Sequence, residues 1–252
     1  MPSTPSVLLV DDTPGEVANF AEAFDVLTHA RTLAELDQAL ASGRRWAVAF
    51  VDFNLGSPSY TGLTALLRLR HERPHTRLVA YSQLAEGGRT LYACAARHWF
   101  EADALLDKVH NESSNLRHYA GHLIAGIDPT PAGWQQRLSH AALIDDILAE
   151  PYWVQIWRAV HEAAGEMQAA AKLLNRDANQ LRGFKDRATH AVIEFNYHIH
   201  DIPRPHDQRN KKGILSTFAA RHWQFLGAPD LSTAMSPTTR GPGRGSRGPS
   251  GR

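Results

Sequence analysis

The chain has 252 residues, of which 43% are hydrophobic and 21% are charged, so it has the composition of a globular protein with room for two domains. No apolar run approaches the roughly 20 residues that a membrane-spanning helix needs, and the N-terminus lacks the basic and apolar segments of an export signal. The single cysteine, Cys94, excludes an internal disulfide, and we expect a cytoplasmic protein.

The net charge of +1 hides a difference between the two halves of the chain. From residue 131 onward there are 16 Lys and Arg against 11 Asp and Glu, whereas residues 1–130 carry 11 against 15. An acidic first half and a basic second half indicate that the two halves bind different partners.

The first 125 residues alternate short β-type runs with stretches whose apolar residues recur at helical spacing. Five repeats of strand and helix predict a parallel sheet that is covered by helices on both faces. The candidate strands are Ser6–Val10, Asp25–Thr28, Trp46–Val51, Arg77–Tyr81 and Ala104–Leu106.

The alternation stops after about residue 125, and a mostly α-helical domain is expected at 135–232. The segment "IDPTPAGW", residues 127–134, holds two prolines and a glycine and predicts a linker. The tail at 233–252 is rich in Gly, Pro, Ser and Arg, which predicts disorder. The expected helices are Gln135–Ala149, Tyr152–Ala164, Met167–Leu174, Ala178–Phe195 and Ile214–Phe225.

Charged and polar residues follow several of the predicted strands. Asp11 and Asp12 leave the first strand, Asp52 closes the third, Ser82 ends the fourth and Lys108 comes after the fifth. Ligands of open α/β sheets bind outside the carboxyl ends of the strands, so these side chains are expected to meet there. Clustered carboxylates suit Mg²⁺, and a lysine and a hydroxyl beside such an ion suit a phosphoryl group.

These residues carry a family resemblance. The pieces "VLLVDD", "VDFNL", "AYSQ" and "LLDK" resemble, in this order, the receiver domain of two-component response regulators. The spacing agrees, because Asp52 follows Asp12 by 40 positions, Ser82 follows Asp52 by 30 and Lys108 follows Ser82 by 26. The resemblance covers about residues 6–125 and implies a five-stranded flavodoxin-like receiver domain at 1–126.

The resemblance implies a role for each residue of the set. Asp52 is the expected phosphoacceptor for a histidine kinase, Ser82 the switch hydroxyl and Lys108 its charge partner. The implied Mg²⁺ ligands are Asp11, Asp12, Asp52 and the main-chain carbonyl of Asn54.

Several positions depart from the family pattern, among them two close to the lysine. Val109 stands where a proline usually follows the lysine, and Leu105 stands where an aromatic switch residue is common. The output surface is therefore expected to be unusual, and a receiver held in one state without phosphate is an alternative.

The most informative stretch of the second half is "EMQAAAKLLNRDANQLRGFKDRATHAV", residues 166–192, which predicts a helix, a short turn and a second helix with Asp177 as its N-cap. Leu181, Phe184 and Ala188 are expected to face inward. The pattern looks similar to bacterial helix-turn-helix output domains, especially Fis-like ones, although two helices with a solvated face are the plainer alternative. The outward residues that would contact DNA are Asn179, Gln180, Arg182, Lys185 and Arg187.

The sequence thus predicts a response regulator that controls transcription by binding DNA, with a sensor histidine kinase as partner, a possible homodimer and no membrane contact. We expect a signalling switch and not a metabolic enzyme. The alternative is a receiver whose helical half docks a protein partner and does not bind DNA.

Overall fold

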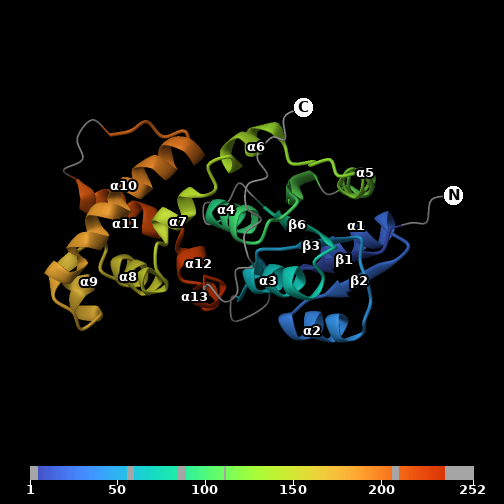
Figure 1. The fold of residues 1–252 in the computed structure, drawn as a ribbon, viewed down its shortest axis with the longest axis horizontal. Coiled ribbons are helices and arrows are strands. Elements are labelled where there is room, and N and C mark those ends of the chain that lie inside the picture. Colours follow the sequence, from blue (N-terminus) through green and yellow to red (C-terminus); the bar gives the residue numbers. More distant parts are fainter. Residues whose placement is uncertain (1–4, 56–59, 84–88, 111, 206–209, 236–252) are drawn as a thin grey trace, which may run out of the picture.

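The structure is a computed structural model that describes residues 5–55, 60–83, 89–110, 112–205 and 210–235. Figure 1 shows an α/β part and a helical part that lie next to each other along the longest axis of the molecule. The tail that the sequence predicts to be disordered lies, from residue 236 on, outside the described residues.

The first part is built on a five-stranded parallel sheet with the strand order β2-β1-β3-β6-β7. This is the flavodoxin-like order, in which the order of the strands reverses between β1 and β3. The predicted doubly wound fold is confirmed. The strands are β1 (Val7–Val10), β2 (Leu27–Ala30), β3 (Val48–Val51), β6 (Arg77–Ser82) and β7 (Ala104–Asp107).

Helices cover both faces of this sheet, which explains why its central strands are continuous apolar runs. Helices α1 and α5 contact each other on one face, and α2, α3 and α4 lie in a row on the other. Side chains of β1, β3 and β6 therefore alternate between two buried clusters. The bounds are α1 (Pro14–Ala23), α2 (Leu33–Ala41), α3 (Gly62–Glu72), α4 (Arg89–Trp99), the 3₁₀ turn η1 (Lys108–His110) and α5 (Ser113–Ile124).

A small antiparallel ribbon follows β3, formed by β4 (Asn54–Leu55) and β5 (Tyr60–Thr61). The N–H of Gly62, the first residue of α3, donates to the carbonyl of Phe53 at 2.6 Å. The ribbon thus leads the chain from β3 directly into α3.

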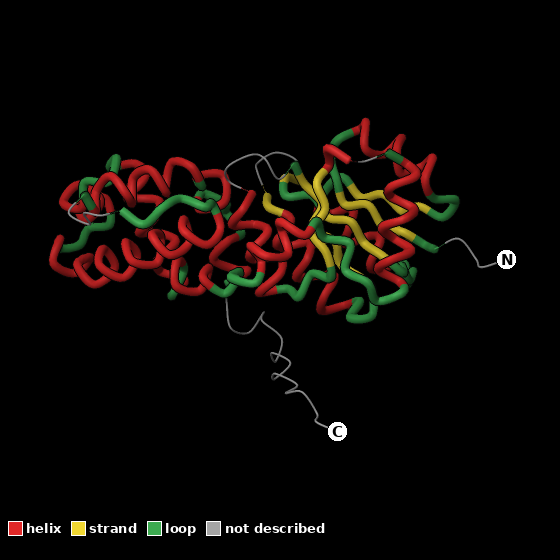
Figure 2. Tube along the Cα trace, turned by 90° about the horizontal axis from the view of Figure 1, so that it is seen from above, coloured by secondary structure: helices red, strands yellow, loops and turns green. Residues whose placement is uncertain are grey.

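The second part of the described chain is entirely helical, and Figure 2 shows its helices beside the sheet. Helix α8 places Trp153 and Trp157 in the core, and the indole N–H of Trp157 donates to the carbonyl of Ile147 at 2.8 Å. The bounds are α6 (Ala132–Leu138), α7 (Leu143–Ile147), α8 (Pro151–Glu162), α9 (Met167–Leu173), η2 (Ala178–Leu181), α10 (Arg182–Ile199), α11 (Lys211–Arg221), α12 (Trp223–Leu226) and α13 (Leu231–Ala234).

The strand expected at 25–28 is found two residues later. Its position is set by β1, because Val7 is paired with Leu27 and Val10 with Ala30. Local residue preference is a weaker constraint than this pairing.

Three expected helices differ from those in the structure. The helix expected at 135–149 is interrupted by turns between α6 and α7, and the one at 178–195 begins as the 3₁₀ turn η2. The helix expected at 214–225 begins at Lys211, where Asn210 caps it, and is interrupted at His222, which is fully buried.

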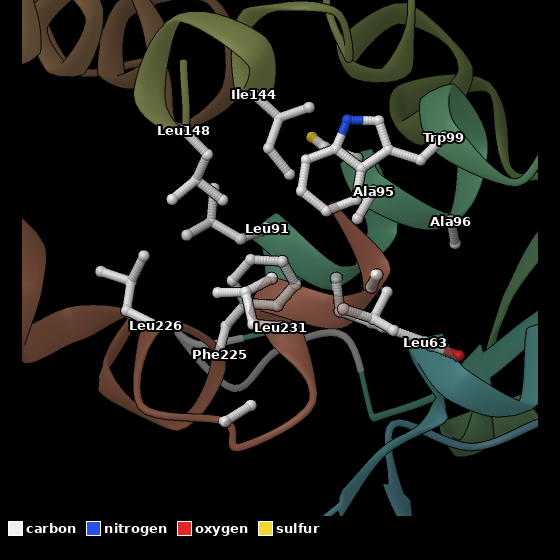
Figure 3. Packing of buried hydrophobic residues seen from close by; sticks show 14 of the residues in the cluster. Leu63, Leu91, Ala95, Ala96, Trp99, Ile144, Leu148, Phe225, Leu226 and Leu231 are labelled. Carbon is white, nitrogen blue, oxygen red and sulfur yellow. The ribbon is translucent and has the colours of Figure 1, made fainter. Parts of the chain in front are cut away.

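One apolar cluster runs through both parts of the molecule. In Figure 3, Leu91, Ala95 and Trp99 of α4 lie near Ile144 and Leu148 of the helical part. The remaining labelled side chains, Leu63, Ala96, Phe225, Leu226 and Leu231, complete this packing of α3 and α4 against α12 and α13.

Polar contacts reinforce the packing between the two parts. The indole N–H of Trp99 donates to Asp145 at 2.8 Å, and the hydroxyl of Thr64 on α3 donates to Asp230 at 2.6 Å. Helix α6 begins inside the segment expected as a linker, and α13 lies at the start of the segment expected as a tail. The domain boundaries themselves stay a prediction.

Among the described helices, none combines the length and the apolar character that crossing a membrane requires.

Candidate functional site

The carboxyl ends of β1, β3, β6 and β7 bring Asp11, Asp52, Ser82 and Lys108 together. The ammonium Nζ of Lys108 lies 2.6 Å from Oδ2 of Asp11 and 3.0 Å from Oδ2 of Asp52. All four residues are buried. The parallel pairing of the strands causes this convergence, because parallel strands all end at the same edge.

Ser82 contacts the other oxygen of the Asp52 carboxylate. Its hydroxyl donates to Oδ1 of Asp52 at 2.8 Å. The two oxygens of Asp52 therefore face a hydroxyl on one side and an ammonium on the other. These two contacts hold the carboxylate in one orientation.

The environment shifts the pKa of both partners. Burial raises the pKa of Asp52, and nearby Asp11 adds to this, while Lys108 and the hydrogen bond from Ser82 act in the opposite direction. Burial alone would lower the pKa of Lys108, but the charges of Asp52 and Asp11 outweigh it and raise that pKa. At neutral pH the lysine is therefore a fixed positive charge next to Asp52.

The three aspartates form a group that can hold a metal ion. One carboxylate oxygen from each of Asp11, Asp12 and Asp52 lies within 4.8 Å of the others. Asp12 is exposed, which leaves the group open to solvent on one side. A set of hard oxygen donors with room for water fits Mg²⁺, so the residues present suit the ion that the sequence predicts.

The fourth expected ligand, the main-chain carbonyl of Asn54, belongs to β4, two residues after Asp52. Two residues that depart from the receiver pattern, Leu105 and Val109, lie on β7 and η1. Leu105 is a buried core residue whose N–H donates to Thr130, and Val109 is 68% exposed on η1. The strand that ends next to Lys108 thus carries no aromatic side chain at position 105.

The expected DNA contacts lie on η2 and α10 of the helical part. Leu181, Phe184 and Ala188 are buried as predicted, and four of the five proposed contact residues are exposed while Lys185 is half-buried. The residues in question are Asn179, Gln180, Arg182, Lys185 and Arg187.

Two of these side chains also have structural contacts. Asp177 and Gln180 form a capping box, in which the N–H of Asp177 donates to Oε1 of Gln180 at 3.2 Å. The guanidinium of Arg187 lies 5.0 Å from the ring centroid of Trp153. Asn179, Arg182 and Lys185 therefore remain the clearer candidates for a contact outside the chain.

Three residues that the sequence does not mark lie close to Asp52 or to its strand. Arg89 donates to Oγ of Ser82 at 3.1 Å, and the hydroxyl of Tyr92 donates to the carbonyl of Val51 at 3.1 Å. Phe225, from the far end of the chain, stacks on Phe53 with ring centroids 6.5 Å apart. No sequence signal marks them, because each contact depends on how α4 and α12 pack.

No protein-family model and no curated protein matches the chain. A solved structure of RcsB from Salmonella enterica serovar Typhimurium, bound to a promoter in the presence of the phosphomimetic BeF3−, is similar with a TM-score of 0.53. The two are 15% identical, and the match covers 87% of this chain and 99% of RcsB.

Two further solved structures are similar to this chain. DrrB, a Thermotoga maritima OmpR/PhoB homolog, matches with 18% identity and a TM-score of 0.40; the match covers 49% of this chain and 54% of DrrB. A Burkholderia pseudomallei response regulator with a phosphorylated aspartic acid matches with 20% identity and a TM-score of 0.39, over 74% of this chain and 97% of that one. The match with RcsB shows that the two proteins have a similar fold, in which an α/β part is followed by a helical part.

Proposed function

We propose that this protein is a two-component response regulator that accepts a phosphoryl group on Asp52 from a sensor histidine kinase. The observation that supports this most strongly is the pair of contacts on Asp52, from the hydroxyl of Ser82 at 2.8 Å and from the ammonium of Lys108 at 3.0 Å. The protein acts as a cytoplasmic signalling switch and not as a metabolic enzyme.

The proposed transfer forms a bond between an oxygen of Asp52 and phosphorus while the P–N bond of the phosphohistidine donor breaks. The electron pair of that bond stays on the imidazole nitrogen, which then takes a proton. Lys108 and Ser82 orient the acceptor and neutralise charge on the phosphoryl oxygens. Asp11, Asp12, Asp52 and the carbonyl of Asn54 would hold Mg²⁺, which when bound neutralises phosphoryl charge.

The acceptor is tested by incubating the full-length protein with Mg²⁺ and acetyl phosphate and measuring incorporation by intact mass. Asp52→Asn should abolish incorporation, because an amide is a poor nucleophile for phosphorus. Asp107→Asn is the matched control, since this neighbouring carboxylate accepts from the N–H of Val109 and lies outside the cluster. Incorporation into Asp52→Asn at the wild-type level would refute the assignment.

We further propose that the helical part binds DNA through α9, η2 and α10, and that phosphorylation of the receiver controls this binding and hence transcription. Three observations support it: the basic balance from residue 131 on, the exposure of Arg182 near the start of α10, and the similar fold of promoter-bound RcsB. A homodimer is part of the proposal, because two-fold proteins match palindromic sites.

DNA binding is tested by gel shift with genomic fragments over a range of salt concentrations. Arg182→Ala should weaken binding and reduce the slope of log K against log salt by about 0.9 if one phosphate contact is lost. Arg204→Ala is the control, because this exposed arginine of the same half is paired with Glu194 at 2.6 Å. Absence of salt-dependent binding would favour the alternative, a helical part that docks a protein partner.

A further inference from the structure

A second buried cation lies beside the proposed phosphoacceptor. Arg89, the first residue of α4, is 7% exposed, and its Nη1 donates to Oγ of Ser82 at 3.1 Å. Ser82 in turn donates to Asp52 at 2.8 Å, so one hydroxyl separates the guanidinium from the acceptor carboxylate. The guanidinium also lies 6.0 Å from the ring centroid of Phe53.

We propose that Arg89 is a direct ligand of the phosphoryl group on Asp52, in addition to Ser82 and Lys108. This inference rests on the proposed function, because it concerns the phosphorylated form of the same site. It adds to that function a residue that binds the modified acceptor from the α4 side, opposite the lysine.

The geometry of the hydroxyl supports this role. In the unmodified site Ser82 donates to Oδ1 of Asp52 and accepts from Arg89. A phosphoryl group on Asp52 brings three acceptor oxygens to this position. The hydroxyl then donates to one of these oxygens, and the guanidinium, whose Nη1 lies 3.1 Å from that hydroxyl, is close enough to donate to another.

The chemistry of the side chain supports it as well. An arginine keeps its charge when buried, and its planar set of donors matches the oxygens of a phosphoryl group. The contact with Phe53, which directly follows Asp52, limits the directions in which the guanidinium can turn. The site therefore holds two fixed cations, Lys108 from the β7 side and Arg89 from the α4 side.

Arg89 lies on the helix that packs against the helical part. Helix α4 begins at Arg89 and carries Leu91, Ala95 and Trp99, which pack against the helical part in Figure 3. A phosphoryl group bound by Arg89 would thus act on the helix that joins the two parts. This route does not need an aromatic side chain at Leu105.

The test uses the full-length protein and beryllium fluoride with Mg²⁺ as a probe of the phosphorylated state, with binding followed by Trp fluorescence or calorimetry. Arg89→Gln should bind the probe about 10-fold more weakly or worse, the size expected for a lost charge-assisted hydrogen bond. Arg89→Lys keeps the charge but not the planar donors and should show an intermediate loss. Both variants are first checked for folding by circular dichroism.

Arg97→Gln is the matched control on the same helix, because its guanidinium binds the carbonyl of Ala102 and the carboxylate of Asp128. It should bind the probe like the wild type. If Arg89→Gln does not fold, Arg89→Lys decides the question. Wild-type affinity in a folded Arg89 variant would overturn the inference.

A double variant separates direct contact from a merely structural support of Ser82. If Arg89 binds the phosphoryl group directly, Arg89→Gln should lower the affinity for the probe in a Ser82→Ala background too. If Arg89 acts only by holding Ser82, Arg89→Gln should not change the affinity in that background. Failure of the wild type to bind the probe at all would count against the proposed function. A wild type that binds, together with an Arg89 variant that binds equally well, would count against this inference alone.

Discussion

At the scale of single residues, His200 at the end of α10 is the clearest case of a group that folding holds in one protonation state. Its Nε2 lies 3.3 Å from Nε2 of His222, which is fully buried. Burial lowers the pKa of His200 to about 4, and the charges of Arg221 and Arg137 contribute in the same direction. The folded protein therefore keeps this imidazole neutral over the range in which an ordinary histidine gains a proton.

The free energy of unfolding should consequently depend on pH. Between the ordinary pKa of 6.5 and the lowered value of about 4, the unfolded state binds more protons, so this contribution is complete above pH 6.5 and is lost as the pH falls toward 4. The loss is on the order of 1 kcal/mol after allowance for the partial exposure of the ring. Urea titrations of the wild type and His200→Gln measure it.

The free energy of unfolding of His200→Gln should change less over this pH range than that of the wild type. Tyr197→Phe on the same helix serves as control, because this substitution replaces neither a histidine nor a carboxylate. Equal slopes for His200→Gln and the wild type would mean that another group causes the acid sensitivity.

At the scale of elements, the approach of α3 to β3 leaves no room behind the proposed phosphoacceptor. A Cβ added to Gly62 would lie 2.0 Å from the carbonyl oxygen of Asp52 and 2.9 Å from the hydroxyl of Tyr92. The backbone carbonyl cannot turn away without moving the acceptor. Glycine at position 62 therefore allows α3 to begin this close to Asp52, directly after the ribbon of β4 and β5.

Gly62→Ala should lower the free energy of unfolding by about 1–3 kcal/mol or more, the usual effect of forcing an extra methyl into a packed site. Denaturant titration measures this, and acetyl phosphate labelling should fall in the same variant. Gly121→Ala in α5 is the matched control: an added Cβ there meets nothing within 4 Å, and the change should raise stability by up to about 1 kcal/mol. A Gly62→Ala variant with the stability and the labelling of the wild type would contradict the close approach of α3 to Asp52.

At the scale of the whole molecule, the two parts share a core through α4. Every residue from Arg89 to Ala96 on this helix is buried, whereas a helix that covers only a sheet leaves one side exposed. Cys94, three positions after Leu91, lies in this stretch, and burial raises the pKa of its thiol to about 12. The thiol should therefore be protected as long as the helical part stays docked.

Phe225→Ala tests this docking, because Phe225 is fully buried and stacks on Phe53 across the interface. It should lower the free energy of unfolding by about 3–5 kcal/mol and increase the reaction rate of Cys94 with a thiol reagent. Leu173→Ala, at a position that is 56% exposed, should change neither quantity. A Phe225→Ala variant with wild-type stability and an equally protected thiol would show that the contact does not hold the parts together.

The sequence by itself determined the sheet, the five residues at its carboxyl edge and the helical second half. The reason is that strand periodicity and the order of the elements suffice to place Asp11, Asp52 and Lys108 at one edge, since parallel strands end together. Buried and exposed positions around Leu181 and Phe184 could likewise be predicted, because helical spacing is a local property.

Only the tertiary structure decided how the two halves are joined and what surrounds Asp52. The burial of α4 from Arg89 to Ala96 and the stack of Phe225 on Phe53 depend on an interface between segments that are distant in the chain. The contact of Arg89 with Ser82 spans only seven positions, but it depends on how α4 packs beside the end of β6. The turns between α6 and α7 and the 3₁₀ start of α10 escaped prediction for a related reason. Packing and capping partners decide where such short elements begin and end, and a residue pattern does not contain those partners.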